Sequence, residues 1–236
     1  MIDLFNRGRY KRANKKIGFT LAEVLITIGI IGVVSALTIP TLISNYQKKQ
    51  TATLLKKTYA DLKNIIRLST VDNEEPSGWK YPVGSNWVDC QNFIKTYYLP
   101  YAKGANLLDT GFQNIKTLNG SFIQHMPACG FETQDGRIIS LFPNTNSGYI
   151  WLYADINGKQ GPNRVGRDIF VFDAYNYAST DYDIRIWLNI KSNPTSNFYA
   201  SSGYGCSKEN DSIYAGFACG AIIQRNNWEI PNDYPW

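Results

Sequence analysis

The chain has 236 residues, a formal net charge of +5 and 44% hydrophobic residues, with 16 Tyr, 11 Phe and 6 Trp. This aromatic-rich composition excludes a largely disordered chain. The first 18 residues hold six basic side chains and one acid, so they account for the whole net charge. The remainder is electrically neutral, and we therefore expect no nucleic-acid partner for it, because phosphate binding needs concentrated Lys and Arg.

A long apolar run follows this basic leader. The run from Phe19 to Ile39 contains 21 residues and a single ionisable side chain, Glu23. At ~1.5 Å per helical residue it is long enough to cross a hydrocarbon core of roughly 30 Å. A secretory signal peptide would have a shorter run with an Ala-x-Ala-like cleavage site after it. The basic leader predicts a cytoplasmic N-terminus and a C-terminal body on the far side of the membrane.

The start of this run carries a family resemblance. The segment Gly18-Phe-Thr-Leu-Ala-Glu23-Val-Leu25 resembles the signal of type IV prepilins and type II secretion pseudopilins. The resemblance implies cleavage by prepilin peptidase after Gly18, N-methylation of Phe19, and assembly with other pilin subunits through the apolar helix. It also implies a bacterial inner-membrane location before assembly. The alternative is an uncleaved signal anchor whose Glu23 reaches the membrane interface.

Glu23 needs a partner, since a lone carboxylate in a membrane segment costs roughly 2.5–3.5 kcal/mol when it lies deep. Cleavage after Gly18 would create an amine on Phe19 at the membrane edge. A pair between Glu23 of one subunit and the amine of its neighbour would offset the cost of burying both charges and would set the axial register.

We expect one helix from about Phe19 to Leu68. Pro40 predicts a kink, because proline removes a backbone donor and disfavours helical geometry in the preceding residue. Beyond it the pattern becomes amphipathic, with an apolar stripe formed by Leu54, Leu55, Tyr59, Leu62, Ile65 and Ile66. The predicted organisation is a leader (1–18), a membrane and assembly half-helix (19–40), an amphipathic half-helix (41–70) and a β-rich extracytoplasmic domain (71–236).

Within the last part, residues 88–98 predict a short helix, which ends before Pro100. Two strands are predicted around Asp135-Gly136, a strong hairpin turn, and further strands are predicted at 149–156, 169–173 and 183–188. Sequential strands with short links favour an antiparallel meander. The fold class is therefore α+β: a long N-terminal helix packed on an antiparallel sheet, which is also what the pilin resemblance implies.

The connection between two of these strands is rich in oxygen-bearing side chains: Asp155, Asn157, Asn163 and Asp168. Calcium takes six to eight oxygen ligands, and glycines in the loop permit tight winding. The loop does not fit the EF-hand pattern, but it loosely resembles the calcium loop of some type II secretion pseudopilins. The alternative is a polar connection whose Asx side chains bond to their own backbone.

Four cysteines, Cys90, Cys129, Cys206 and Cys219, all follow the apolar run. Three pairings are formally possible. Because Cys206 and Cys219 are only thirteen residues apart, we pair them, which leaves Cys90 with Cys129. An even count in an exported domain favours disulfides. Resemblance to pilins makes the loop 206–219 an expected partner-binding face.

The structural-subunit hypothesis is therefore preferred: a pilin-like component of a type IV pilus or a type II secretion pseudopilus. The alternative is a minor or tip subunit that acts as an adhesin or binding module. A membrane-anchored enzyme is disfavoured, because His125 is isolated and no catalytic or phosphate-binding motif occurs.

Overall fold

The computed structural model of the chain describes residues 18–82, 87–112, 114–123, 129–143, 150–174, 184–186 and 197–236. Two compact units are present, Met1–Asn45 and Tyr46–Trp236. From Tyr46 onward, the amphipathic half of the long helix thus belongs to the same unit as the β-rich domain. His125 and the leader lie outside the described residues.

Helix α1 spans Leu21–Asn73 and is continuous through Pro40, slightly longer than expected. In the first unit its large apolar side chains are exposed: Leu21, for example, is 78% exposed and Leu37 is 73% exposed. Among the described residues, α1 is the helix that is long and apolar enough to cross a membrane, judged by length and composition. This surface needs lipid or other helices as its surroundings.

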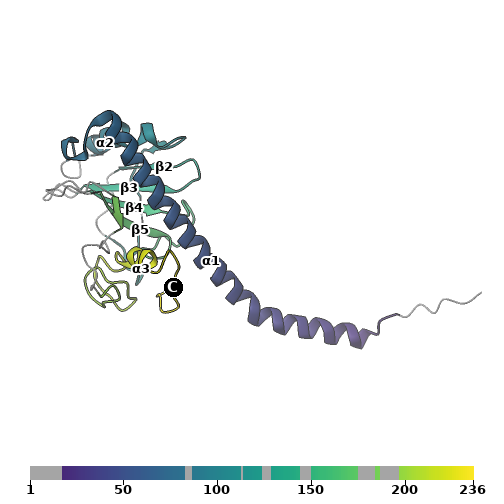
Figure 1. The fold of residues 1–236 in the computed structure, drawn as a ribbon. Coiled ribbons are helices and arrows are strands. Elements are labelled where there is room, and N and C mark those ends of the chain that lie inside the picture. Colours follow the sequence, from purple (N-terminus) through teal and green to yellow (C-terminus); the bar gives the residue numbers. More distant parts are fainter. Residues whose placement is uncertain are drawn as a thin grey trace, which may run out of the picture. The chain divides into compact units, whose positions relative to one another are not determined.

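In the second unit α1 buries the predicted stripe. Leu55, Leu62, Ile65 and Ile66 are all buried, and the half-buried Tyr59 stacks on Phe172 with ring centroids 6.5 Å apart. The amphipathic pattern is therefore confirmed, since its spacing of three and four residues places these side chains on one helical face. Figure 1 shows this part of α1 lying across the strands of the sheet.

The sheet has six strands in the order β1-β2-β3-β4-β5-β6, and every neighbouring pair is antiparallel. The strands are β1 Asn106–Leu108, β2 Cys129–Glu132, β3 Ile138–Pro143, β4 Ile150–Asp155, β5 Ile169–Ala174 and β6 Ile184–Ile186. The predicted meander is thus confirmed, and β1 is an additional strand. The hairpin turn is confirmed as well: the Gly136 N–H donates to the Thr133 carbonyl (2.9 Å), and Gly136 has φ +82°, which glycine adopts without steric cost.

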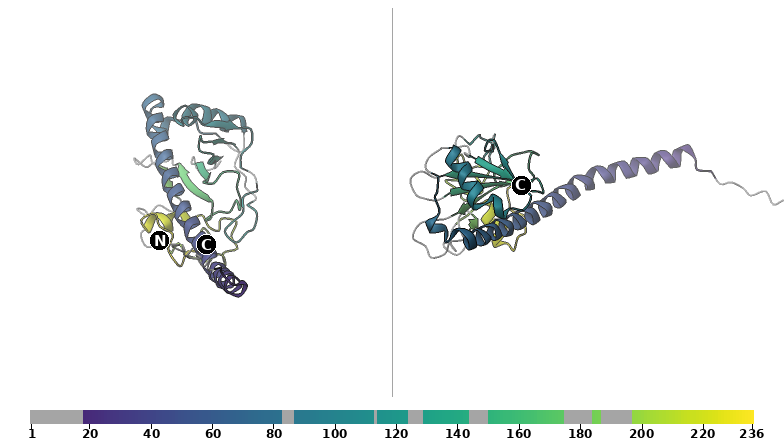
Figure 2. Two further views of the ribbon diagram at one scale, coloured as in Figure 1. Left: turned by 90° about the vertical axis from the view of Figure 1, so that its right-hand side faces the viewer. Right: turned by 90° about the horizontal axis from the view of Figure 1, so that it is seen from above.

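Shorter elements complete the second unit. Helix α2 (Trp87–Tyr97) confirms the short helix and contacts β1 and β2. The 3₁₀ turns η1 (Pro76–Gly78) and η2 (Leu99–Tyr101) flank it. Helix α3 (Cys219–Arg225) contacts β5, and the two views in Figure 2 place α2 and α3 near different ends of the sheet.

Both faces of the sheet are covered. One face packs against α1, α2 and α3, with Phe131, Leu152 and Phe172 among its buried residues. The other face carries a second apolar cluster, in which Trp151 and Tyr153 meet Phe217 edge-on with ring centroids 5.8 Å away in each case. Burial on two sides explains why β4 is apolar along nearly its whole length rather than alternating.

Candidate functional site

The start of α1 forms the first candidate site. Thr20 and Glu23 bond reciprocally: the backbone N–H and the Oγ1 hydroxyl of Thr20 each donate to Glu23 Oε2 at 2.8 Å, and the Glu23 N–H donates to Thr20 Oγ1 at 3.2 Å. This is a capping box, in which two side chains satisfy backbone donors that the first helical turn cannot pair internally.

The capping box holds the Glu23 carboxylate beside the residues where processing is expected. Gly18 and Phe19 immediately precede it, outside the helix and exposed. A cut after Gly18 would place the new amine of Phe19 one residue from Thr20. The carboxylate is thus already directed toward the helix N-terminus, where the helix dipole favours negative charge.

The loop between β4 and β5 forms the second candidate site, and the structure brings its four predicted residues together. The Asn157 N–H donates to Asp155 Oδ1 at 3.0 Å. The N–H groups of Asn163 and Arg164 donate to the two oxygens of Asp168, at 2.7 and 2.6 Å. These bonds are the Asx-type contacts of the alternative interpretation, in which the loop organises its own backbone.

The two carboxyl groups of this loop are buried close to one another. Burial raises the pKa of Asp155 to about 8, and the nearby charge of Asp168 adds to the shift. Burial also raises the pKa of Asp168, although the N–H groups of Arg164 and Asn163 and the side chain of Asn157 oppose this. Two oxygens of the loop, Asp155 Oδ2 and Asn163 Oδ1, are buried without a hydrogen-bond partner among the described residues. A proton or a cation would relieve this arrangement.

A calcium ion is compatible with these donors in type. Asp155, Asp168 and Asn163 offer the carboxylate and amide oxygens that hard cations prefer. The described residues contain no group of three or more His, Cys, Asp or Glu side chains arranged to hold a metal. Backbone carbonyls and water would therefore have to complete the ligand set.

Comparison with known families separates the two parts of the chain. Residues 13–39 match the model of the prokaryotic N-terminal methylation motif, so the chain carries the type IV prepilin/pseudopilin signal. Residues 41–236 match the model described as a family of unknown function, DUF6613. The chain belongs to this family. No curated protein matches it, and no solved structure does. The signal points to a structural subunit rather than to an enzyme.

The DUF6613 domain contains both disulfides in the expected pairing. Cys90 of α2 is bonded to Cys129 at the start of β2, and Cys206 is bonded to Cys219 at the start of α3. All four are buried. The first disulfide joins α2 to the sheet, and the second joins Cys206 to the first residue of α3.

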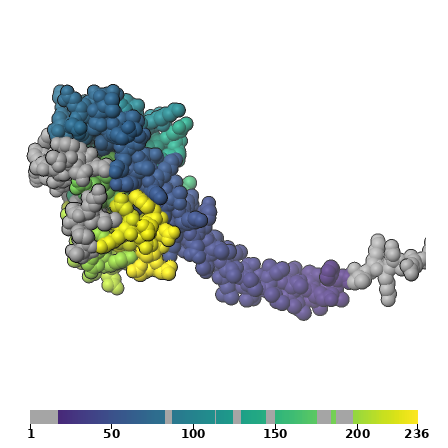
Figure 3. Space-filling view, in the orientation of Figure 1, coloured from purple at the N-terminus to yellow at the C-terminus, as the bar shows by residue number. Residues whose placement is uncertain are grey.

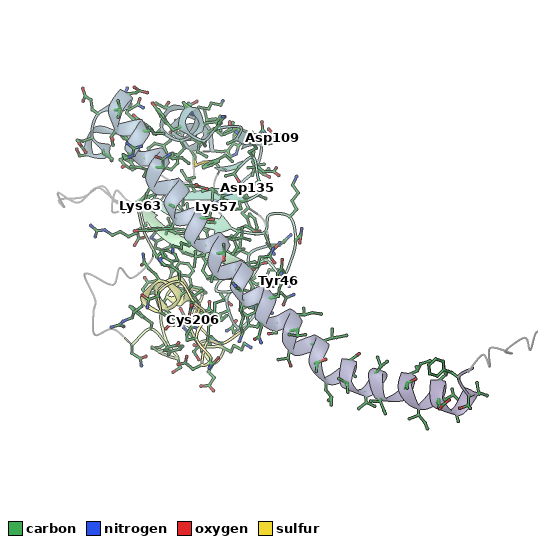
Figure 4. The ribbon with its side chains drawn as sticks, turned by 45° about the vertical axis from the view of Figure 1, so that its right-hand side comes forward. Tyr46, Lys57, Lys63, Asp109, Asp135 and Cys206 are labelled. Atoms are coloured by element: carbon green, nitrogen blue, oxygen red, sulfur yellow. A yellow bond between two sulfur atoms is a disulfide. The ribbon has the colours of Figure 1, made fainter. Side chains whose placement is uncertain are left out.

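One functional group of the domain was not anticipated from the sequence. Arg137 is buried directly before β3. It donates to Asp135 through Nε (2.9 and 3.0 Å), to Thr58 Oγ1 through Nη1 (2.8 Å) and to Asp61 Oδ2 through Nη2 (2.5 Å). Lys57 pairs with Asp135 at 2.6 Å, and Figure 4 shows these two side chains together where α1 crosses the β2–β3 turn. We call these five residues the helix clamp, because they join α1 to the sheet.

The residues of the helix clamp that meet from α1 and from the β2–β3 turn are far apart in the sequence. Arg137 lies 79 positions from Thr58 and 76 from Asp61. The signal that could have found it is a single arginine beside the hairpin turn, directly before an apolar strand. Burial opposes ionisation of Asp135, but hydrogen bonds from Arg137, Lys57 and Thr133 outweigh it and hold the pKa of Asp135 well below its usual range.

Proposed function

We propose that this chain is a prepilin-like subunit that is cleaved after Gly18, N-methylated on Phe19 and polymerised through α1 into a filament of the type IV pilus or type II secretion class. The observation that supports this most strongly is the methylation motif at 13–39 at the head of a helix whose apolar side chains are exposed from Phe19 to Tyr46. Apolar surface of this extent requires lipid before assembly and neighbouring helices after it.

In this proposal Glu23 has two successive partners. Before assembly the capping box with Thr20 satisfies the carboxylate within its own chain. In the filament, the carboxylate pairs with the Phe19 amine of a neighbouring subunit, because an ion pair offsets the cost of two buried charges more fully than a hydroxyl can. The cleavage creates the partner that Glu23 lacks in the precursor.

The location and partners follow from the same segment. The precursor spans the inner membrane once, with its basic leader in the cytoplasm and the DUF6613 domain outside. Prepilin peptidase removes the leader, and other pilin or pseudopilin subunits are the assembly partners. Removal of the leader also removes the whole net charge, so that neutral subunits can pack side by side.

The test is the intact mass of the chain extracted from membranes of cells that contain prepilin peptidase. We expect a mature chain that begins at methylated Phe19. Gly18→Val should leave the leader attached, because the β-branched side chain obstructs the cleavage site. Gly78→Val is the matched control, since the added Cβ meets no atom within 4 Å at either glycine, and it should be processed normally. A wild-type chain that retains its leader would refute the proposal.

We also propose that calcium binds in the β4–β5 loop as a structural ion, held by Asp155, Asp168, Asn163 and the side-chain oxygen of Asn157. The two buried oxygens without hydrogen-bond partners support this. Calorimetry at pH 7 should show heat on calcium addition, together with a rise in the thermal unfolding midpoint. Both effects should disappear in Asp155→Asn and persist in Asp109→Asn, a control outside the loop. The absence of both effects in the wild-type chain would rule out the ion.

A further inference from the structure

A pocket of about 330 Å³ lies beside α3, outside the loop 206–219 that the sequence indicated as a binding face. Three segments line it: residues 197–199, residues 222–226 at the end of α3, and residues 231–233 of the C-terminal tail. Its volume is at the lower end of the range of small-molecule sites, roughly 300–1,000 Å³. In Figure 3 the tail, in yellow, lies on the surface of the domain against α1.

The walls of the pocket are fixed to one another. The Cys206 N–H donates to the Phe198 carbonyl at 2.7 Å, and Cys206 is bonded to Cys219, the first residue of α3. The Arg225 guanidinium lies over the Phe198 ring, 5.2 Å from its centroid. The Tyr199 hydroxyl donates to Asp233 Oδ1 at 3.2 Å, which connects the first wall to the tail. A binding site with fixed walls loses little entropy when a ligand binds.

The backbone at the end of α3 is also held in an uncommon conformation. Asn227 and Trp228 have φ of +55° and +65°, a region that bulky residues rarely occupy. The Trp228 N–H donates to the Ile223 carbonyl at 2.8 Å, and its ring packs on Tyr59 of α1, with centroids 5.4 Å apart. Packing against α1 thus holds the chain where it leaves α3, directly after Asn226 of the pocket wall.

The lining has the chemistry of a site for a neutral polyhydroxyl ligand. Pro231 supplies partly exposed apolar surface, and Tyr199, 37% exposed, offers an aromatic face, whereas Phe198 and Ile222 are 3% and 5% exposed and form the buried backing of the pocket. The charges of Arg225 and Asp233 have opposite signs, so the pocket favours neither anions nor cations.

The polar groups of the pocket retain bonding capacity. The Asn226 amide donates one hydrogen to the Glu229 carbonyl (3.1 Å), and an amide carries a second hydrogen and an acceptor oxygen. Asp233 can accept further bonds beyond the one from Tyr199. The Tyr199 hydroxyl gives its single hydrogen to Asp233, which leaves its oxygen free to accept a bond.

We propose that this pocket binds one or two sugar rings of a neutral glycan. The C–H face of a pyranose ring packs on the ring of Tyr199, and its hydroxyl groups bond to Asp233 and Asn226. The disulfide Cys206–Cys219 then has a role in binding as well as in stability, because it joins two of the three walls. Glycan binding would give the filament a target surface, but the pocket itself does not require assembly.

The test uses the full-length chain in a detergent without a sugar headgroup, since a glucoside or maltoside would compete for the site. An array of immobilised neutral oligosaccharides that contain glucose, galactose or N-acetylglucosamine identifies the retained glycan, and calorimetry then measures its affinity. Tyr199→Ala and Asp233→Ala should each weaken binding about tenfold, as expected for the loss of one well-placed contact. The controls are Phe122→Ala, an aromatic residue that is 59% exposed outside the pocket, and Asp109→Asn. Neither should change the affinity.

The outcomes separate this proposal from the filament hypothesis. The uncleaved Gly18→Val chain should bind the glycan with wild-type affinity, whether or not it can assemble. If Tyr199→Ala strongly lowers the thermal unfolding midpoint, Tyr199→Phe is used in its place. Tyr199→Phe keeps the aromatic ring, loses the bond to Asp233 and should bind the glycan more weakly than wild type. Retention of no neutral glycan, retention of charged glycans or peptides alone, or equal affinity of the pocket variants and wild type would overturn the proposal.

Discussion

Removal of the Arg137 guanidinium should weaken the attachment of α1 to the β2–β3 turn. Arg137→Met keeps the aliphatic stem and removes every polar bond of the helix clamp that the arginine makes. The side chain of Arg137 is 5% exposed, whereas those of Asp61 and Asp135 are 46% and 35% exposed. Loss of one partner from a fully buried ion pair costs about 3–5 kcal/mol. Because water can reach both carboxylates here, we reduce the expected loss in free energy of unfolding to about 2–4 kcal/mol.

Urea unfolding of the full chain in micelles, followed by tryptophan fluorescence, measures this loss. With a slope of roughly 2 kcal/mol per M, the midpoint should fall by roughly 1–2 M. Arg67→Met is the matched control on the same helix, since Arg67 is exposed and bonds to Asn64 one turn away (3.0 Å); it should cost at most about 0.5 kcal/mol. Addition of Asp61→Asn to Arg137→Met should recover part of the loss, because it removes an unpaired charge. Equal midpoints for Arg137→Met and Arg67→Met would refute the role of the clamp.

Three further predictions concern separate parts of the chain. Asp155 holds a proton in the native state up to pH about 8, whereas the unfolded chain loses it near pH 4. Without calcium, the free energy of unfolding should therefore fall as the pH rises from about 4 to 8. The contribution of Asp155 to this fall is up to ~1.4 kcal/mol per pH unit. Asp155→Asn should lower this slope without removing it, because burial also raises the pKa of Asp173 to about 7 and that of Asp168; an unchanged slope would contradict the assigned burial of Asp155. Replacement of Cys206 and Cys219 by serine together should cost about 3 kcal/mol, since the disulfide closes a loop with a sequence separation of 13; urea midpoints of the variant and wild type under oxidising conditions check this. Glu23→Val should be processed normally but excluded from filaments that also contain wild-type subunits. Immunoblots of sheared filaments measure this incorporation. Normal incorporation of the variant would exclude the intersubunit pair of Glu23 and the Phe19 amine.

The pilin-type signal and the secondary structure could be predicted from the sequence because both depend on residues close together in the chain. Gly18 to Glu23 carry the resemblance to the prepilin signal in adjacent residues, and the spacing of Thr20 and Glu23 allows the capping box. The stripe from Leu55 to Ile66 predicted the buried face of α1, since helical periodicity is a local property. The turn at Gly136 fixed the β2–β3 hairpin, and adjacent strands of a meander need no long-range information.

Only the tertiary structure decided which distant groups meet. The helix clamp joins Thr58 and Asp61 to Arg137, and no local pattern marks those residues as partners. The pocket beside α3 likewise needs residues 197–199, the end of α3 and the tail in one place, and Trp228 packs against Tyr59, far away in the sequence. Side-chain contacts of this kind are set by how the chain closes on itself. The sequence therefore determined the prepilin signal and the local elements, whereas only the fold decided which distant side chains meet at the helix clamp and at the pocket beside α3.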